Sequence, residues 1–217
     1  MGNKIKIVPA ILTSSTGELS EMVDLANGFA DRIQIDIMDG RFVPSRSVSC
    51  KQVKEAAIKV SWEVHLMVEQ PGKYLKCFKE AGAKKIIFHY EATDSPGAAA
   101  RSIKQLGLEV GLAINPETKP EDIISLLPEI DSVLLLSVEP GYYGSPFIPE
   151  VLEKVNKLRN IQQKLKIGID GGIKETNIAK VAASGVDSIC IGSAIFLSKK
   201  PAESYSRLRE IAEAAIK

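Results

Sequence analysis

Three side chains that can carry out acid–base or metal chemistry lie in or at the end of short apolar runs. Asp36 ends the run RIQID, His65 lies in WEVHLM, and Asp170 ends KIGID. Carboxylates and an imidazole together can bind a divalent cation or transfer protons. Two carboxylates on opposite sides of a substrate suit a two-base epimerisation, in which one removes the proton next to a carbonyl and the other returns it to the opposite face. A cation between them would stabilise the enediolate.

Glycines follow three short apolar runs, Ser132–Ser137, Lys166–Ile169 and Ser188–Ile191, and suggest an anion site. Backbone N–H groups in a glycine turn and at a helix start favour a phosphate, and the pattern after the Asp-Gly-Gly turn predicts a helix from Lys174. A tight turn is the alternative for any single glycine. No Lys or Arg belongs to the set, so recognition would use the backbone. The glycines are Gly141, Gly144, Gly171, Gly172 and Gly192.

The elements that must position these residues alternate regularly along the chain. Short β-branched runs, typical of strands, are separated by longer amphipathic segments, typical of helices. The expected strands are Ile5–Leu12, Arg32–Asp36, Trp62–Met67, Lys85–His89, Glu109–Ile114, Ser132–Ser137, Lys166–Ile169 and Ser188–Ile191. The expected helices are Glu18–Phe29, Lys51–Lys59, Gly72–Ala81, Ala98–Leu106, Lys119–Leu127, Glu150–Gln163, Lys174–Ser184 and Ala202–Ile216.

This alternation predicts an α/β protein, a (β/α)₈ TIM barrel that forms a single domain over residues 1–217. The units follow one another with no break in composition and no linker. A doubly wound open sheet is the alternative, but it would carry a glycine fingerprint after its first strand. The sequence there is Pro9-Ala10-Ile11-Leu12.

In a barrel of this kind, the carboxyl-terminal strand ends meet at one mouth, where the chemistry takes place. We therefore expect Asp36, His65 and Asp170 to face one another at a solvent-facing mouth. The segments Asp39–Ser49 and Glu139–Phe147 are longer than usual βα loops and are predicted to be functional.

Two further polar sites near strand ends have simpler interpretations. His89, in FHYE, either packs beneath the site or contacts a ligand, and the sequence leaves both open. Asp39-Gly40 is predicted to form the turn after the second strand rather than to take part in chemistry.

Composition narrows the class of protein. Hydrophobic residues make up 45% and charged residues 25%, and the net charge of +1 gives no nucleic-acid footprint. No stretch approaches the ~20 apolar residues of a membrane span, and the apolar run near the start is too short for a signal peptide. The cysteines are odd in number and widely spaced, which argues against a disulfide framework or structural zinc site and predicts a reducing, cytoplasmic location. They are Cys50, Cys77 and Cys190.

Several stretches together resemble the ribulose-phosphate 3-epimerase family over essentially the whole chain. The motifs DIMDG, VHLMV and DGGI, in this order, are specific to that group of sugar-phosphate epimerases. The matching stretches are Pro9–Leu12, Asp36–Pro44, Val64–Val68, Ala81–Ala83, Gly111–Thr118, Val138–Gly144, Asp170–Ile173 and Gly192–Phe196.

The resemblance implies an isomerase that interconverts D-ribulose 5-phosphate and D-xylulose 5-phosphate with a divalent metal, Zn²⁺, Fe²⁺ or Mn²⁺. It implies that Asp36 is one base and Asp170 the opposite acid, that both bind the metal with His65, and that the protein is a homo-oligomer. The residues implied to contact substrate and its phosphate are His65, Gly141, Tyr142, Tyr143, Gly144, Gly171, Gly172, Gly192 and Ser193.

Four departures from the family pattern concern the same site. Gln34 replaces a metal-binding histidine, and Ala10 replaces a substrate-contacting serine. Gly141–Ser145 replaces the GFGGQ loop, and Leu136-Ser137 replaces methionine and threonine. Three ligands can still hold a metal, with the Gln34 carbonyl as a weak fourth for a hard cation. Weaker metal binding, a different metal and a shifted substrate all stay open.

Three alternative functions are left. One is a 3-epimerase of another ketose phosphate, such as allulose 6-phosphate. A lyase or decarboxylase on a similar barrel would place a lysine where Met38 stands in Asp36-Ile37-Met38-Asp39. The third is a non-catalytic phosphosugar-binding barrel, which Gln34 and Ala10 would suit.

Overall fold

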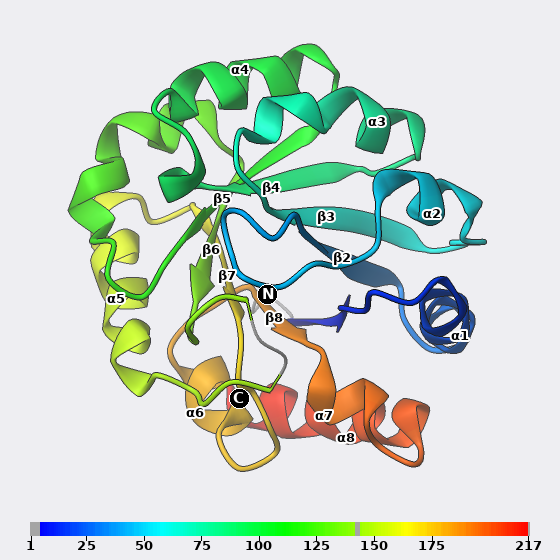
Figure 1. Ribbon diagram of the computed structural model, residues 1–217. Helices are drawn as coiled ribbons and strands as arrows, with labels where there is room; N and C mark the ends of the chain where they lie inside the picture. Colours follow the sequence, from blue (N-terminus) through cyan, green and yellow to red (C-terminus); the bar gives the residue numbers. More distant parts are fainter. Residues whose placement is uncertain (1–4, 142–143, 217) are drawn as a thin grey trace.

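The chain forms a closed barrel of parallel strands in sequence order, described here from a computed structural model for residues 5–141 and 144–216 (Figure 1). β1 pairs with both β2 and β8, which closes the barrel. The strands are β1 (Lys6–Ile11), β2 (Arg32–Met38), β3 (Ser61–Met67), β4 (Lys85–His89), β5 (Glu109–Ile114), β6 (Ser132–Leu136), β7 (Lys166–Asp170) and β8 (Ser188–Ile191).

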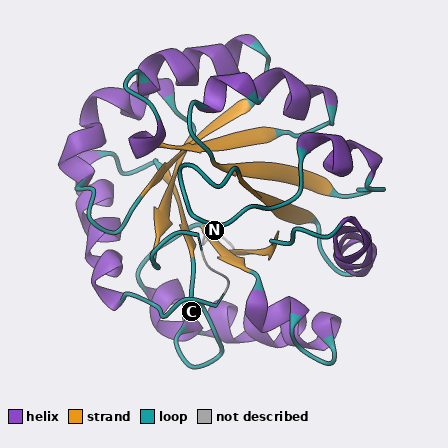
Figure 2. Ribbon diagram, in the orientation of Figure 1, coloured by secondary structure: helices purple, strands orange, loops and turns teal. Residues whose placement is uncertain are grey.

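Helices surround this barrel on the outside (Figure 2), so the predicted single-domain TIM barrel is confirmed. The α-helices are α1 (Thr16–Asn27), α2 (Cys50–Glu55), α3 (Leu75–Glu80), α4 (Pro96–Gln105), α5 (Leu152–Ile161), α6 (Ile178–Ala183), α7 (Ser193–Phe196) and α8 (Pro201–Ala214). The 3₁₀ helices are η1 (Pro71–Lys73), η2 (Tyr90–Ala92), η3 (Pro120–Glu129) and η4 (Pro149–Val151). Among the described residues, none of these helices has the length and apolarity that a membrane crossing requires.

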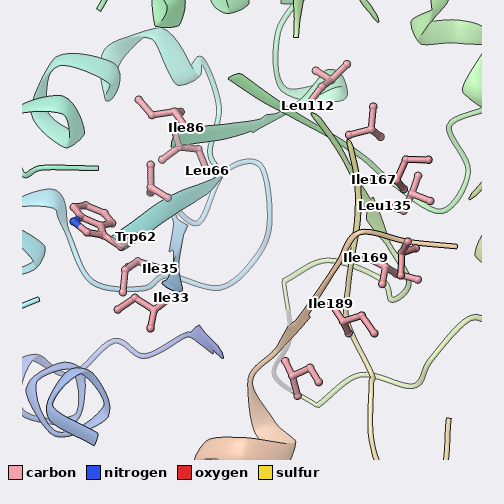
Figure 3. Packing of buried hydrophobic residues seen from close by; sticks show 14 of the residues in the cluster. Ile33, Ile35, Trp62, Leu66, Ile86, Leu112, Leu135, Ile167, Ile169 and Ile189 are labelled. Atoms are coloured by element: carbon pink, nitrogen blue, oxygen red, sulfur yellow. The ribbon is translucent and has the colours of Figure 1, made fainter. Parts of the chain in front are cut away.

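Alternate residues of each strand face the helices or the barrel interior. On β2, Ile33 and Ile35 are buried in the layer against the helices, whereas Gln34 and Asp36 face inward and touch each other. Each fully buried aliphatic side chain contributes about 1.5–3 kcal/mol, so this layer fixes the strands that carry the site. Residues of the layer shown in Figure 3 are Ile33, Ile35, Trp62, Leu66, Ile86, Leu112, Leu135, Ile167, Ile169 and Ile189.

The helix expected from Lys174 begins later, because α6 starts at Ile178. The side chain of Asn177 accepts a hydrogen bond from the Lys174 N–H (2.8 Å) and donates one to the Gly172 carbonyl (3.0 Å). These bonds fold the segment before α6 into a turn, since Asn readily bonds nearby backbone. The helix start therefore does not directly follow the Asp-Gly-Gly turn, as the sequence had suggested.

Other helix predictions also differ from the structure. The segment expected as Lys119–Leu127 is the 3₁₀ helix η3, whose interior contains Pro128. The helix expected over Lys51–Lys59 ends at Glu55, since Ala56 is extended. The helix expected over Gly72–Ala81 is divided into η1 and α3, and the short helices α7 and η2 were not predicted.

A disulfide joins Cys50 in α2 to Cys77 in α3, so the expectation of no disulfide was wrong. The two cysteines are 27 residues apart, but successive helices of the barrel bring their Cα atoms to 6.3 Å, within the ~4.4–6.8 Å range that a disulfide needs. Cys190 is free and buried. The cysteine count therefore no longer supports a reducing compartment.

Candidate active site

A pocket lies at the carboxyl-terminal ends of the strands and brings together the predicted residues of the described chain. No Lys or Arg lines it among the described residues, as expected. Tyr142 and Tyr143 lie outside the described residues. The predicted residues that line the pocket are Asp36, His65, Gly141, Gly144, Asp170, Gly171, Gly172, Gly192 and Ser193.

Asp36, His65 and Asp170 form a compact group on β2, β3 and β7. The Nδ1 atom of His65 lies 3.3 Å from Oδ1 of Asp36 and 3.6 Å from Oδ2 of Asp170. One ligand atom from each residue falls within 4.8 Å of the others. This spacing suits a single divalent cation, since tetrahedral ligands at ~2.0–2.2 Å from an ion lie about 3.3–3.6 Å apart.

Gln34 occupies the centre of this group in an unexpected way. Its Nε2 donates to Oδ1 of Asp36 (2.9 Å) and to Oδ2 of Asp170 (2.7 Å). Its Oε1 accepts from the buried thiol of Cys190 (3.2 Å). Since carboxylates only accept and a thiol donates, this amide orientation satisfies every partner. Gln34 therefore links the two carboxylates instead of merely lacking a histidine's affinity for metal.

Both carboxylates are hard to ionise in this environment. Burial is the main cause that raises the pKa of Asp36 to about 7, against the opposing hydrogen bond from Gln34. Burial also raises the pKa of Asp170 to about 7, and the charge of Asp36 raises it further. Burial lowers the pKa of His65, although Asp170 opposes this. A pair of acids poised near neutral pH is suited to giving and taking protons.

The site is more enclosed than the sequence predicted. Asp36 is only 7% exposed and the side chain of Asp170 13%, so a freely solvent-facing position for these carboxylates was wrong. The loops after β2 and β6 account for this. Val43 packs with Met38 over the site, and Gly141 lies so close to Val43 that an added Cβ would be 3.0 Å from the valine Cβ.

The glycines after β7 are required by packing, whatever they bind. Gly171 and Gly172 have φ of +114° and +66°, a region that favours glycine. A Cβ at Gly171 would lie 2.5 Å from Cγ2 of Val138, and one at Gly172 would lie 2.7 Å from the backbone nitrogen of Phe147. Any larger residue at Gly172 would disturb the fold, so the tight-turn interpretation is confirmed at this position.

Two side chains outside the predicted set hold the site in shape. The hydroxyl of Ser137 lies 3.0 Å from the carbonyl oxygen of Asp170 and 2.7 Å from that of Gly171, which fixes the end of β7. The predicted turn role of Asp39 is confirmed, since its carboxylate accepts three backbone hydrogen bonds. The donors are the N–H groups of Arg41, Phe42 and Glu69.

His89 lies behind His65 and does not line the pocket, so the packing interpretation is confirmed. Its Nε2 is 2.9 Å from Nε2 of His65, and burial lowers its pKa to about 4. Its other nitrogen faces Glu91 at 3.4 Å. The sequence signal for this arrangement was present, because Ile87 and His89 alternate on the inward side of β4, but a strand pattern does not give the partner.

The model of the Ribulose-phosphate 3 epimerase family matches residues 6–196. The chain belongs to this family. It is therefore a ribulose-phosphate 3-epimerase family enzyme, an isomerase, which agrees with the resemblance carried by its motifs.

Relatives of this family cover nearly the whole chain. Ribulose-phosphate 3-epimerase from Mycobacterium bovis is 37% identical over 215 residues, 96% of this chain and 93% of the relative. The cytoplasmic isoform of ribulose-phosphate 3-epimerase from Oryza sativa is 34% identical over 215 residues, 96% of this chain and 94% of the relative.

A solved structure supports the fold alone. The 3-hexulose-6-phosphate synthase from Salmonella typhimurium has a TM-score of 0.74 and 19% identity, covering 97% of this chain and 100% of that chain. At this identity, the likeness between the two proteins is one of architecture.

Proposed function

We propose that this family member interconverts D-ribulose 5-phosphate and D-xylulose 5-phosphate. The observation that carries the proposal is a pair of buried carboxylates, Asp36 and Asp170, on strands that are not neighbours in the barrel, with His65 beside both. Such a pair can reach a carbon from two sides, as inversion at that carbon requires.

Asp36 and Asp170 exchange roles in the proposed reaction. Ionised Asp36 takes the proton from C3, next to the C2 carbonyl. The electron pair of the C–H bond forms a double bond between C2 and C3, and the π pair of the carbonyl moves to its oxygen. Protonated Asp170 then delivers its proton to the other face of C3, which restores the carbonyl with inverted configuration. One ionised and one neutral carboxyl are needed, and both pKa values near 7 allow this at neutral pH.

We assign a divalent cation, Zn²⁺, Fe²⁺ or Mn²⁺, to Asp36, His65 and Asp170, because their donor atoms have the spacing described above. When bound, the cation would supply positive charge next to the oxygen on which negative charge develops. Gln34 would need to turn its carbonyl toward the cation to act as a fourth ligand, since it now directs its NH₂ to the carboxylates.

We assign the phosphate to the backbone around Gly171, Gly172, Gly192 and Ser193, which lines the pocket. With no Lys or Arg in the described lining, backbone N–H groups would carry the recognition. Because Gly172 is also required by packing, Ser193→Ala is the milder test, and it probes the hydroxyl that Ser193 adds to these backbone N–H groups. It should raise KM for the phosphosugar with little change in unfolding free energy.

Turnover and exchange measurements test the proposal directly. In D₂O, the enzyme should convert ribulose 5-phosphate to xylulose 5-phosphate and incorporate deuterium at C3, more slowly after chelation of metal. Allulose 6-phosphate, tested in parallel, identifies a shifted substrate. Absence of both product and C3 exchange with ribulose 5-phosphate, under every metal condition, would overturn the assignment.

We also propose a cytoplasmic location and a homo-oligomer. The cytoplasmic isoform among the relatives supports the location, whereas the Cys50–Cys77 disulfide is unusual for a reducing compartment. Cell fractionation tests the location, and light scattering of the purified chain tests the oligomeric state.

A further inference from the structure

A row of polar side chains continues from the metal-binding group into the barrel wall. His65 on β3 and His89 on β4 have ring centroids 5.1 Å apart with planes inclined by 19°. Their Nε2 atoms are 2.9 Å apart, and both rings are fully buried. At this distance one nitrogen donates and the other accepts, because two protons or two lone pairs facing each other would repel.

This contact makes the proton positions of the two rings depend on each other. If His65 binds a cation through Nδ1, that nitrogen carries a lone pair and the proton lies on Nε2. His89 must then accept at its Nε2 and carry its own proton on Nδ1. In the opposite arrangement, His89 donates to His65 and the proton of His65 lies on Nδ1, where it blocks a metal.

Glu91 is placed to select between these arrangements. Its Oε2 is the acceptor facing Nδ1 of His89, at 3.4 Å, and an ionised carboxylate cannot donate. Its Oε1 is already held by the backbone N–H of Asn115 (2.9 Å) and by the hydroxyl of Thr118. Burial alone would raise the pKa of Glu91, but the neighbouring His89 and these hydrogen bonds lower it overall.

The rest of the surroundings keeps this row in place. The ring of Phe42, from the loop after β2, lies 4.8 Å from the ring of His89, centroid to centroid. Within the described residues, Nδ1 of His89 has no partner at full hydrogen-bond geometry. The acceptors beside it are the carboxylate of Glu91, at 3.4 Å, and the side-chain oxygen of Asn115, and only the carboxylate carries a charge.

We propose that Glu91, acting through His89, fixes His65 in the tautomer whose Nδ1 lone pair faces the metal position. Glu91 and His89 are thus positioning residues for Asp36, His65 and Asp170, the metal ligands of the proposed function. Partners of this kind, behind a metal-binding histidine, typically change metal affinity 10- to 100-fold when removed. The carboxylate here acts across a second imidazole.

Glu91→Gln is a sharp test because it reverses one hydrogen bond and keeps the shape. The Asn115 N–H holds the amide oxygen of the new side chain on its side, so the NH₂ faces Nδ1 of His89. His89 should then donate to His65 and place a proton on Nδ1 of His65. Affinity for Zn²⁺, measured by competition with a chelator, should fall roughly 10- to 100-fold.

Glu117→Gln is the matched control, since it makes the same change on an exposed residue in the neighbouring loop, after β5. Its zinc affinity should stay within about twofold of wild type. Equal affinities of Glu91→Gln and Glu117→Gln, with both variants folded by circular dichroism, would overturn the proposal.

Nitrogen NMR gives a readout that needs neither metal nor substrate. The chain has only two histidines, so ¹⁵N-histidine labelling reports just these two rings. In the metal-free protein, Glu91→Gln should move the proton of His65 from Nε2 toward Nδ1. Unchanged ring shifts would contradict the tautomer role. A protein that fails to epimerise ribulose 5-phosphate but shows both effects would refute the proposed reaction and leave this inference standing.

Discussion

Buried carboxylates occur at both ends of the barrel, but their surroundings differ. At the amino-terminal end, Glu63 lies 3.3 Å from Arg32 and 3.7 Å from Lys85, so its charge is compensated. At the carboxyl-terminal end, Asp36 and Asp170 share one amide and one imidazole, and no Lys or Arg lines their pocket within the described chain.

Asp187 is a second carboxylate at the amino-terminal end that has cations beside it. It lies 2.6 Å from Arg159 and 3.1 Å from Lys166. Burial alone would raise its pKa, yet the Ile167 N–H and these two cations lower it overall. Cations beside a carboxylate stabilise the fold, whereas a pair left near its neutral form is available for proton transfer or for a metal.

The largest effect should separate the two ends by activity. Asp36→Asn and Asp170→Asn should each lower kcat/KM by roughly 10²–10⁴, because each removes a general acid–base group. Glu63→Gln should leave the turnover of folded protein within about threefold, since Glu63 is not part of the site pocket. Steady-state kinetics of the three variants measures this, and an Asn variant with more than a tenth of wild-type activity removes that Asp from the mechanism.

The next effect concerns metal affinity and pH. In the metal-free protein, protons on Asp36 and Asp170 compete with a cation up to their pKa of about 7. Affinity should therefore rise between pH 6 and pH 8, by up to about tenfold per pH unit for each proton displaced. Chelator competition in buffers across this range checks the slope. A flat profile would show that the pair is already ionised before metal binds.

The stability of the metal-free protein should also change with pH in this range, but it should decrease as pH rises, whereas metal affinity increases. The folded-state pKa of about 7 for Asp170 exceeds its ordinary 3.8, so the folded protein binds more protons and loses stability as pH rises from about 4 through about 7. Asp170→Asn removes this loss. Without metal at pH 8, it should be more stable than wild type by on the order of 2 kcal/mol, because coupling to Asp36 reduces the full shift.

Urea unfolding at pH 5 and pH 8, with chelator present, measures that difference. From pH 5 to pH 8, the urea concentration at the unfolding midpoint should decrease more for wild type than for Asp170→Asn. Glu63→Gln gives the contrast, since it should lose roughly 1–3 kcal/mol of stability at both pH values by leaving its cations without a charged partner. Parallel pH profiles for wild type and Asp170→Asn would contradict the raised pKa.

Sequence alone predicts much of this molecule, because the barrel repeats a simple pattern. β4 and β5 have the predicted bounds, since β-branched runs between polar turns specify buried parallel strands. Helix starts are less predictable, because a single side chain such as Asn177, which bonds the backbone of the preceding turn, delays α6 by several residues. The disulfide depends on which helices become neighbours, which cysteine spacing does not encode.

In the candidate site, too, some features could be predicted from the sequence and others could not. Asp36, His65 and Asp170 follow from strand ends in a barrel, so their meeting could be predicted. The orientation of Gln34 could not, because it is set by Cys190, 156 residues later in the chain. The link from His65 to Glu91 likewise runs through tertiary contacts of β3, β4 and η2.

The smallest predicted effect concerns the role of Gln34. Either Gln34 prevents the two carboxylates from binding metal, or it is only a poor metal ligand itself. Gln34→His places an imidazole beside Asp36 and Asp170, removes an amide that donates to both, and removes the acceptor of the Cys190 thiol. An imidazole binds Zn²⁺ better than an amide oxygen, so zinc affinity should increase by about tenfold. Epimerase activity at limiting metal should rise or stay the same.

Gln34→Leu is the control, because it loses the amide without adding a ligand and should leave zinc affinity no higher than wild type. If Gln34→His and wild type bind zinc equally in side-by-side titrations, the three-ligand group does not hold the metal, and the amide link between the carboxylates is the functional state of this site.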